Sequence, residues 1–321
     1  KLVNKVIPTH AELWKTGQIE ITTTPYAHPI LPLIFDTNLA AVGDIGAELP
    51  TNRFNKPTDA AIQVEKGLDL AEKLLGQRPT GMWPAEGAVS QEVLGMFAKE
   101  GVKWIATGEH VLSKSLEIPT FKRNTDGIVT NPEVLYTPWY GQLNRQDDVA
   151  IFFRDLSISD QVGFTYSGMS PEMAVADMMK ALEAAREVST TMDRPLVVSI
   201  VLDGENAWEH YQNDGIDFLS LMYETLTTTD WLKTTTPTQY IEKYGPQIEK
   251  LDRVFPASWF QPNFATWIGE TEETYAWDYL QKTRAFYDRA NASDNYTEKN
   301  LSKHLIICYL LKGRTGFGGT V

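Results

Sequence analysis

The sequence has a single cysteine in 321 residues, Cys308, and this residue lies in an apolar run from Leu305 to Leu311. One thiol excludes a disulfide framework and a metal site built from cysteines. No apolar stretch approaches the roughly 20 residues that span a bilayer. No signal peptide is recognisable, so we expect no membrane partner, and the compartment stays open.

Basic residues are also scarce. The chain has 29 Lys and Arg against 42 Asp and Glu, which leaves a net charge of −13. Such a surface repels phosphate, so nucleic acid is not expected as a partner, whereas a neutral ligand is accommodated easily. Histidines 10, 110, 210 and 304 have no metal-ligand spacing among themselves. We therefore expect neither a metal nor a cofactor.

Apolar segments rich in β-branched residues alternate with segments of helical periodicity, which is typical of an α/β fold with a parallel sheet. Strands are expected at residues 17–24, 80–83, 102–106, 149–153, 197–202 and 232–236, with an irregular excursion at 111–148. We predict a (β/α) barrel over residues 1–255. Residues 256–321, which open with a tryptophan-rich loop, are predicted to begin an α-helical appendage whose loop reaches the site.

The expected strand at 197–202 is followed at once by Asp203, Gly204 and Glu205. Ligands of parallel α/β folds bind at the carboxyl ends of the strands, so these acids would stand at the mouth of a pocket. Glu86 follows the short strand at 80–83 in the same way, beside Trp83. The alternative interpretation is that these acids cap or favour the helices that follow them.

Other polar and aromatic residues follow expected strands. His28 lies between prolines after residues 17–24, where its ring could donate a hydrogen bond to a ligand hydroxyl. Arg154 and Asp155 follow residues 149–153, where both are expected at the substrate and where an arginine can position the carboxylates of the site by charge-assisted hydrogen bonds. A structural histidine and a structural ion pair are the alternatives. Trp83, Trp208, Trp259 and Trp267 lie in loops, and flat rings with one polar edge suit the faces of sugars. Two carboxyl groups in one aromatic pocket match the needs of glycoside hydrolysis, with one protonated and one ionised.

Four segments resemble four of the five ordered sequence regions of glycoside hydrolase family 57, and are most similar to its amylopullulanase-type members. They read GQIEITTTPYAHPILPLIF at 17–35, MWPAEGAVS at 82–90, LDGENAWEHY at 202–211 and NFATWIGE at 263–270. The resemblance implies a seven-stranded (β/α) barrel followed by helices, acting on α-glucans with retention of configuration. It makes Glu86 the nucleophile and Asp203 the general acid/base. His28, Trp208 and Trp267 would lie near the substrate, with Glu205 in a supporting role.

The first region of the family, a His-Gln-Pro segment at the end of the first strand, has no counterpart in this sequence. We therefore expect a barrel incomplete at its N-terminus and a missing N-terminal segment of a longer protein. Three functions stay open beside an α-1,4 and α-1,6 glucan hydrolase: a 4-α-glucanotransferase, a carbohydrate-binding fragment without catalysis, and a metal-dependent deacetylase-like barrel using His28 and Asp203.

Overall fold

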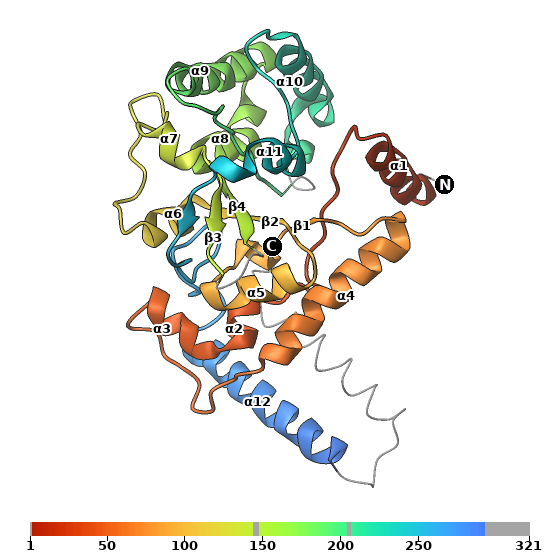
Figure 1. Ribbon diagram of the computed structural model, residues 1–321, viewed down its shortest axis with the longest axis vertical. Coiled ribbons are helices and arrows are strands. Elements are labelled where there is room, and N and C mark those ends of the chain that lie inside the picture. The colour runs from red at the N-terminus through yellow and green to blue at the C-terminus, as the bar shows by residue number, and fades with distance from the viewer. Residues whose placement is uncertain (1, 144–147, 204–206, 293–321) are drawn as a thin grey trace.

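The computed structural model of the chain describes residues 2–143, 148–203 and 207–292 (Figure 1). The α-helices there are α1 Val3–Lys15, α2 Leu31–Phe35, α3 Ala40–Gly43, α4 Pro57–Leu75, α5 Gln91–Lys99, α6 Glu109–Ser115, α7 Pro132–Leu135, α8 Leu156–Asp160, α9 Pro171–Ser189, α10 Ile216–Thr228, α11 Pro237–Tyr244 and α12 Thr271–Asn291. The strands are β1 Gly81–Met82, β2 Trp104–Gly108, β3 Trp139–Gly141, β4 Val149–Arg154 and β5 Lys250–Leu251. None of the helices in the described ranges could cross a membrane.

The five strands form one sheet in the order β1-β2-β4-β3-β5. The pairs β1–β2, β2–β4 and β3–β5 are parallel, and β3 runs antiparallel to β4. All of β2 and β4 is buried. This burial explains why their sequences are apolar except for Thr107 and Arg154, because both faces of a parallel sheet are covered. The α/β fold class is confirmed, whereas closure of the sheet into a barrel is not seen among the described residues.

Three of the six expected strands form, as β1, β2 and β4. Residues 17–24 and 197–202 join the sheet through one bridge each, Thr23 to Met82 and Ser199 to Arg154, both parallel. The strand expected at 232–236 is wrong, since these residues lie outside helices and strands. The irregular excursion expected at 111–148 is also wrong in part, because α7 and β3 lie within it.

The segment 197–202 was expected to be buried on both faces, but it is only half-buried. Its apolar side chains Ile200 and Leu202 pack against the cluster formed by α9, α10 and their neighbours. Its other side borders a cavity. The hydrogen bonds of its backbone go mainly to loops and side chains rather than to a neighbouring strand. The segment is extended and rich in β-branched residues, but it does not form a continuous row of β-sheet hydrogen bonds.

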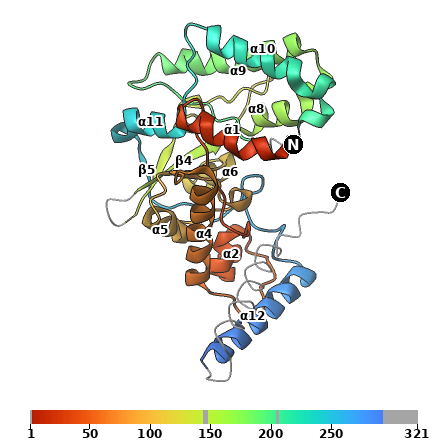
Figure 2. The same ribbon diagram turned by 90° about the vertical axis from the view of Figure 1, so that its right-hand side faces the viewer.

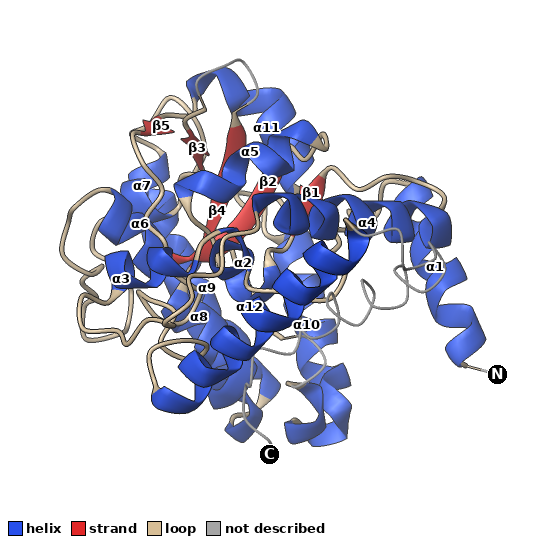
Figure 3. Ribbon diagram, turned by 90° about the horizontal axis from the view of Figure 1, so that it is seen from below, coloured by secondary structure: helices blue, strands red, loops and turns tan. Residues whose placement is uncertain are grey.

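The largest apolar core lies around α2, α4, α5 and the buried face of the sheet. Pro57 stands at the first position of α4, and Gly76 ends the helix with φ +79°, as the sequence predicts. Figure 1 shows the sheet in the middle of the molecule, with α9 and α10 at one end and α12 at the other. The turned view in Figure 2 gives the same order, and Figure 3 shows helices enclosing the strands.

The helix expected over about 272–287 forms as α12 and packs on the main core rather than apart from it. Trp277 is 1% exposed and contacts Phe54 at a ring distance of 5.6 Å. Arg284 of α12 binds both carboxylate oxygens of Asp59 in α4, at 2.8 and 3.1 Å. The division at residues 255 and 256 stays a prediction, and the helix expected at 296–311 lies outside the described residues.

Candidate active site

A cavity of about 560 Å³ lies on one side of the sheet, against β2, β4 and the extended segment 197–203. Trp104 and Ala106 of β2 both line it, because alternate residues of a strand point to the same face. Its remaining wall comes from residues far apart in the sequence. The lining residues are Thr22, His28, Trp83, Trp104, Ala106, Phe152, residues 197–203, Thr235, Pro237 and Trp259.

Glu86 adjoins this cavity through His28. The imidazole Nε2 of His28 lies 3.2 Å from Oε1 of Glu86, and the hydroxyl of Thr24 lies 3.3 Å from Nδ1 of the same ring. Both His28 and Glu86 adopt left-handed backbone conformations, with φ +53° and +54°. This conformation costs a residue with a side chain about 1 kcal/mol or more, and such residues cluster at functional sites.

The Glu86 carboxyl has a pKa below its ordinary value of 4.5, first because His28 donates a hydrogen bond to the charged form. Partial burial acts in the opposite direction, and the indole of Trp259 lowers the pKa further. The indole N–H of Trp259 is buried and has no hydrogen-bond acceptor in good geometry among the described residues. It therefore acts on the Glu86 carboxylate as a nearby dipole. Glu86 is therefore held ionised at neutral pH.

Trp83 and Trp259 form an aromatic corner beside Glu86, with ring centroids 5.2 Å apart and the planes nearly perpendicular. The backbone N–H of Trp259 donates to the carbonyl of Glu86 at 3.1 Å. Glycines make this approach possible, since a Cβ on Gly108 would stand 2.1 Å from the Trp259 carbonyl oxygen. Two of the four predicted loop tryptophans, Trp83 and Trp259, line the cavity.

Arg154 is 5% exposed and is not among the cavity-lining residues. Its Nε donates to the carbonyl of Val201 at 2.6 Å, and one terminal nitrogen binds Oδ1 of Asp160 at 2.5 Å. Its guanidinium carbon lies 5.0 Å from the centre of the Trp259 ring. The structure brings Arg154 behind the cavity wall rather than into the cavity.

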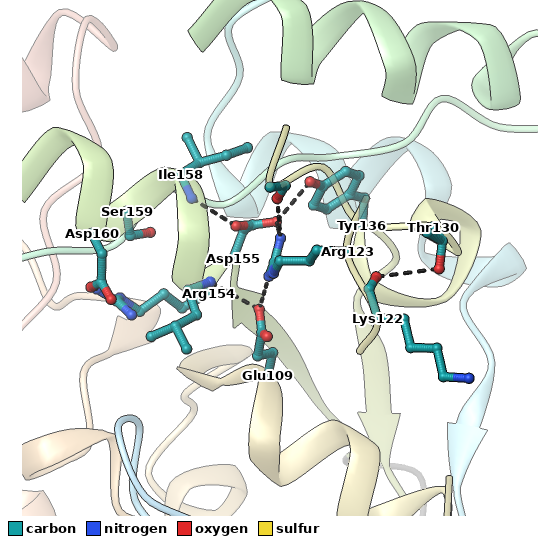
Figure 4. Close-up of polar contacts among 12 residues, drawn as sticks. Glu109, Lys122, Arg123, Thr130, Tyr136, Arg154, Asp155, Ile158, Ser159 and Asp160 are labelled. Atoms are coloured by element: carbon teal, nitrogen blue, oxygen red, sulfur yellow. Dashed lines mark hydrogen bonds and ion pairs between the residues drawn. The ribbon is translucent and has the colours of Figure 1, made fainter. Parts of the chain in front are cut away.

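Asp155 is fully buried in a network of charged groups (Figure 4). One oxygen caps α8 through the N–H of Ile158, at 2.8 Å, and the other accepts from Arg123 and from the Tyr136 hydroxyl. Neither oxygen points to the cavity, so the structure places Asp155 in a structural role instead of the predicted substrate contact.

Sequence reasoning missed Glu109, Arg123 and Tyr136 of this network. Arg123 binds Glu109 at 2.5 Å, and burial raises the pKa of the Glu109 carboxyl and that of the Tyr136 hydroxyl. Glu109 directly follows β2, a position that could have drawn attention to it. Arg123 lies in a stretch without periodicity, where no sequence signal was available.

The remaining predicted residues are spread over the structure. Asp203 is exposed and lines the same cavity as His28, whereas Glu205 lies outside the described residues. Trp208 is half-buried, with its ring 5.4 Å from Tyr211 and 6.5 Å from Phe218. Trp267 is 3% exposed within the main core. Neither of these two tryptophans is among the cavity-lining residues.

The described ranges hold no group of three His, Cys, Asp or Glu side chains placed to bind a metal ion. The chemistry the site supports rests instead on one ionised carboxylate beside the cavity, one exposed carboxyl group that lines it and four aromatic side chains in its wall.

Several solved structures have the same fold at low sequence identity. The α-amylase AmyC of Thermotoga maritima superimposes with a TM-score of 0.69 at 17% identity, over 96% of this chain and 63% of that enzyme. A branching enzyme of Thermococcus kodakaraensis gives 0.70 at 15%, over 98% and 64%. A branching enzyme of Pyrococcus horikoshii gives 0.71 at 15%, over 98% and 63%. The chain thus spans less than two-thirds of the length of each.

No curated protein sequence matches the chain. The family model of glycosyl hydrolase family 57, in contrast, matches residues 1–252. This match covers most of the sequence, including three of the four segments that carry the resemblance and both candidate carboxylates. The chain belongs to glycosyl hydrolase family 57.

Proposed function

We propose that the chain is the catalytic part of a retaining glycoside hydrolase that acts on α-glucans, with Glu86 as the nucleophile and Asp203 as the general acid/base. The observation that carries this proposal is the hydrogen bond from His28 to Glu86 in the wall of the cavity that Asp203 also lines. Family membership and the α-amylase fold support the reaction class.

The environment of Glu86 suits its proposed role. Glu86 has a lowered pKa and a donor on its carboxylate, which suits a group that must attack in its ionised form. Asp203 is exposed and lines the cavity, so it is accessible to the leaving oxygen of a bound glucan. In the first step the Glu86 carboxylate attacks the anomeric carbon, and the glycosidic oxygen leaves with the proton of Asp203. In the second step Asp203 takes a proton from water, which attacks the anomeric carbon and releases Glu86.

The lining of the cavity suits an uncharged sugar chain. Trp83, Trp104, Phe152 and Trp259 contribute four aromatic rings, and among the described residues the charged or titratable side chains that line it are His28 and Asp203. We propose starch-type α-1,4 glucans as the substrate. Pullulan, with its α-1,6 links, is a second substrate to be tested.

The test compares Glu86→Gln and Asp203→Asn with the unchanged chain on maltooligosaccharides and on pullulan. Both variants should lose at least about 10³-fold in kcat. External azide should restore turnover of Asp203→Asn on an activated aryl glycoside by replacing the water of the second step. Unchanged turnover in Glu86→Gln would remove this residue from the mechanism.

The alternative reaction is transfer of the glucosyl chain to a second sugar instead of water. Two of the three structures described above are branching enzymes, and this favours transfer as the alternative. Product analysis separates the two reactions, since transfer lengthens or branches the products while hydrolysis only shortens them. Tight glucan binding without any product from the unchanged chain would instead identify a carbohydrate-binding fragment.

A further inference from the structure

We propose that Arg154 is a positioning residue that holds the segment carrying Asp203 in place against Trp259, whose backbone N–H bonds to the carbonyl of Glu86. This inference rests on the proposed function. It assigns Arg154 no contact with the substrate, because the side chain is buried behind the cavity wall.

The segment before Asp203 depends on a few individual hydrogen bonds. It pairs with the sheet at one residue only, through the bridge between Ser199 and Arg154. Its other polar backbone groups bond to loops and side chains. The hydrogen bonds are Val197 N–H to the Tyr136 carbonyl at 2.8 Å, Asp155 N–H to the Ser199 carbonyl at 3.1 Å, Val201 N–H to the Ser159 hydroxyl at 3.1 Å and Arg154 Nε to the Val201 carbonyl at 2.6 Å.

The bond from Arg154 is the shortest of the four, and its donor is charged. Charge-assisted hydrogen bonds are roughly twice as strong as neutral ones. The bond also acts on Val201, two residues before Asp203, whereas Ser199 and Val197 are farther away along the chain. Of these four hydrogen bonds, those from Arg154 and to the Ser159 hydroxyl therefore act nearest to Asp203 along the chain, and only the bond from Arg154 is charge-assisted.

The same guanidinium contacts the other half of the site. It lies 5.0 Å from the Trp259 ring centre, and Trp259 donates its backbone N–H to the carbonyl of Glu86. A cation over an indole face is worth about 0.5–2 kcal/mol, more where water is excluded. One side chain thus links the segment that precedes the proposed acid to Trp259, whose backbone in turn bonds to that of the proposed nucleophile.

Only arginine can make these contacts together. Its planar group offers Nε to Val201, a terminal nitrogen to Asp160 and a flat face to Trp259. Lysine carries the same charge as a single ammonium group, which neither stacks nor donates in a fixed fork. Arg154→Lys therefore preserves the charge and most of the volume but loses the geometry.

A displaced acid affects substrates unequally. The sugar released from a maltooligosaccharide is a poor leaving group that must be protonated. The 2,4-dinitrophenolate released from an aryl glycoside needs no proton. Misplacement by about 1 Å can cost about 100-fold. On the activated substrate kcat/KM reports only the first step, which needs no proton, whereas kcat also includes the second step, in which Asp203 acts as a base. We therefore expect Arg154→Lys to lose about 10–100-fold in kcat/KM on maltooligosaccharides and less than about 3-fold in kcat/KM on the activated substrate.

Arg284→Lys is the matched control. Arg284 is also mostly buried and paired with acids, Asp59 and Asp288, but it belongs to α12. Arg284→Lys should leave the ratio of the activities on maltooligosaccharides and on the activated glycoside unchanged. Asp160→Asn removes the ion pair while keeping the bond to Val201, and it should lose less than Arg154→Lys. Equal losses of Arg154→Lys on both substrates, or none on either, would overturn the proposal.

A second measurement does not depend on turnover. Deuterium uptake of peptides covering 196–203 should rise several-fold in Arg154→Lys and stay unchanged in Arg284→Lys. If Arg154→Lys does not fold, Ser159→Ala replaces it, because this variant removes the neighbouring hydrogen bond to Val201. Ser159→Ala should then show the unequal losses on the two substrates that are predicted for Arg154→Lys. Wild-type uptake in Arg154→Lys contradicts the proposal. Full turnover in Glu86→Gln and Asp203→Asn would instead refute the proposed function, so the two failures are distinguishable.

Discussion

The Nε2 atom of His28 lies 3.2 Å from Oε1 of Glu86, and both residues hold positive φ angles 58 positions apart in the sequence. The strained backbone at each residue is offset by what surrounds it. Thr24 bonds the far nitrogen of the imidazole, and the Glu86 carbonyl accepts from Trp259. Each of the following predictions changes one contact in this arrangement or in its support.

His28→Ala should shift the acid limb of the pH profile upward. The hydrogen bond from His28 is the largest cause of the lowered Glu86 pKa, so its loss lets the carboxyl protonate at higher pH. Glu86 must be ionised to attack, and activity will therefore fall earlier as the pH decreases. The measurement is kcat/KM from about pH 3 to pH 7. An acid limb that stays in place, or moves to lower pH, would show that His28 does not set this pKa.

Trp83→Ala should weaken substrate binding more than turnover. Trp83 lines the cavity, and its loss removes an apolar face that we expect to cover a sugar ring. The KM for maltooligosaccharides should rise about 10-fold, which corresponds to about 1.4 kcal/mol. Trp231→Ala is the control, because Trp231 lies against Arg186 and does not line the cavity. An equal rise in KM in both variants would contradict the assignment.

Gly108→Ala and Gly95→Ala should have opposite effects on stability. A Cβ at Gly108 would approach the Trp259 carbonyl oxygen to 2.1 Å, whereas a Cβ at Gly95 meets nothing within 4 Å. Gly95 lies inside α5, where alanine should stabilise by about 0.5–1 kcal/mol. Gly108→Ala must displace the Trp259 loop, so we expect lower stability and lower kcat. Denaturant unfolding and turnover of the pair measure both effects.

Arg123→Met should be strongly destabilising because it leaves Glu109 and Asp155 buried without their cation. Breaking such a buried network costs about 3–5 kcal/mol. The matched variant is Arg53→Met, which removes the ion pair with Asp36 from a half-exposed position and should cost less than about 1 kcal/mol. Urea unfolding of the two variants provides the comparison. A small loss in Arg123→Met would mean that the network is not a structural support.

Several elements of this fold follow from local sequence. The length of α4 and the buried positions Val64, Leu68 and Ala71 are predictable from helical periodicity, Pro57 and Gly76. The strands β2 and β4 are predictable from continuous apolar runs. The prediction of a strand at 232–236 is wrong. Its threonines favour an extended backbone, but no neighbouring strand pairs with that backbone among the described residues.

The sequence by itself determined the α/β class and the family, and it yielded the two acids as a hypothesis, because alternating apolar segments, ordered motifs and carboxylates after strands are all local patterns. Only the tertiary structure decided which side chains lie beside Glu86 and Arg154. It turned Asp155 away from the cavity, buried Trp267 in the core, set His28 against Glu86 and placed Arg154 between the Val201 carbonyl and the Trp259 ring. Such contacts join residues 50 or more positions apart in some cases, and no short-range pattern records them, since they arise from the packing of whole segments against one another.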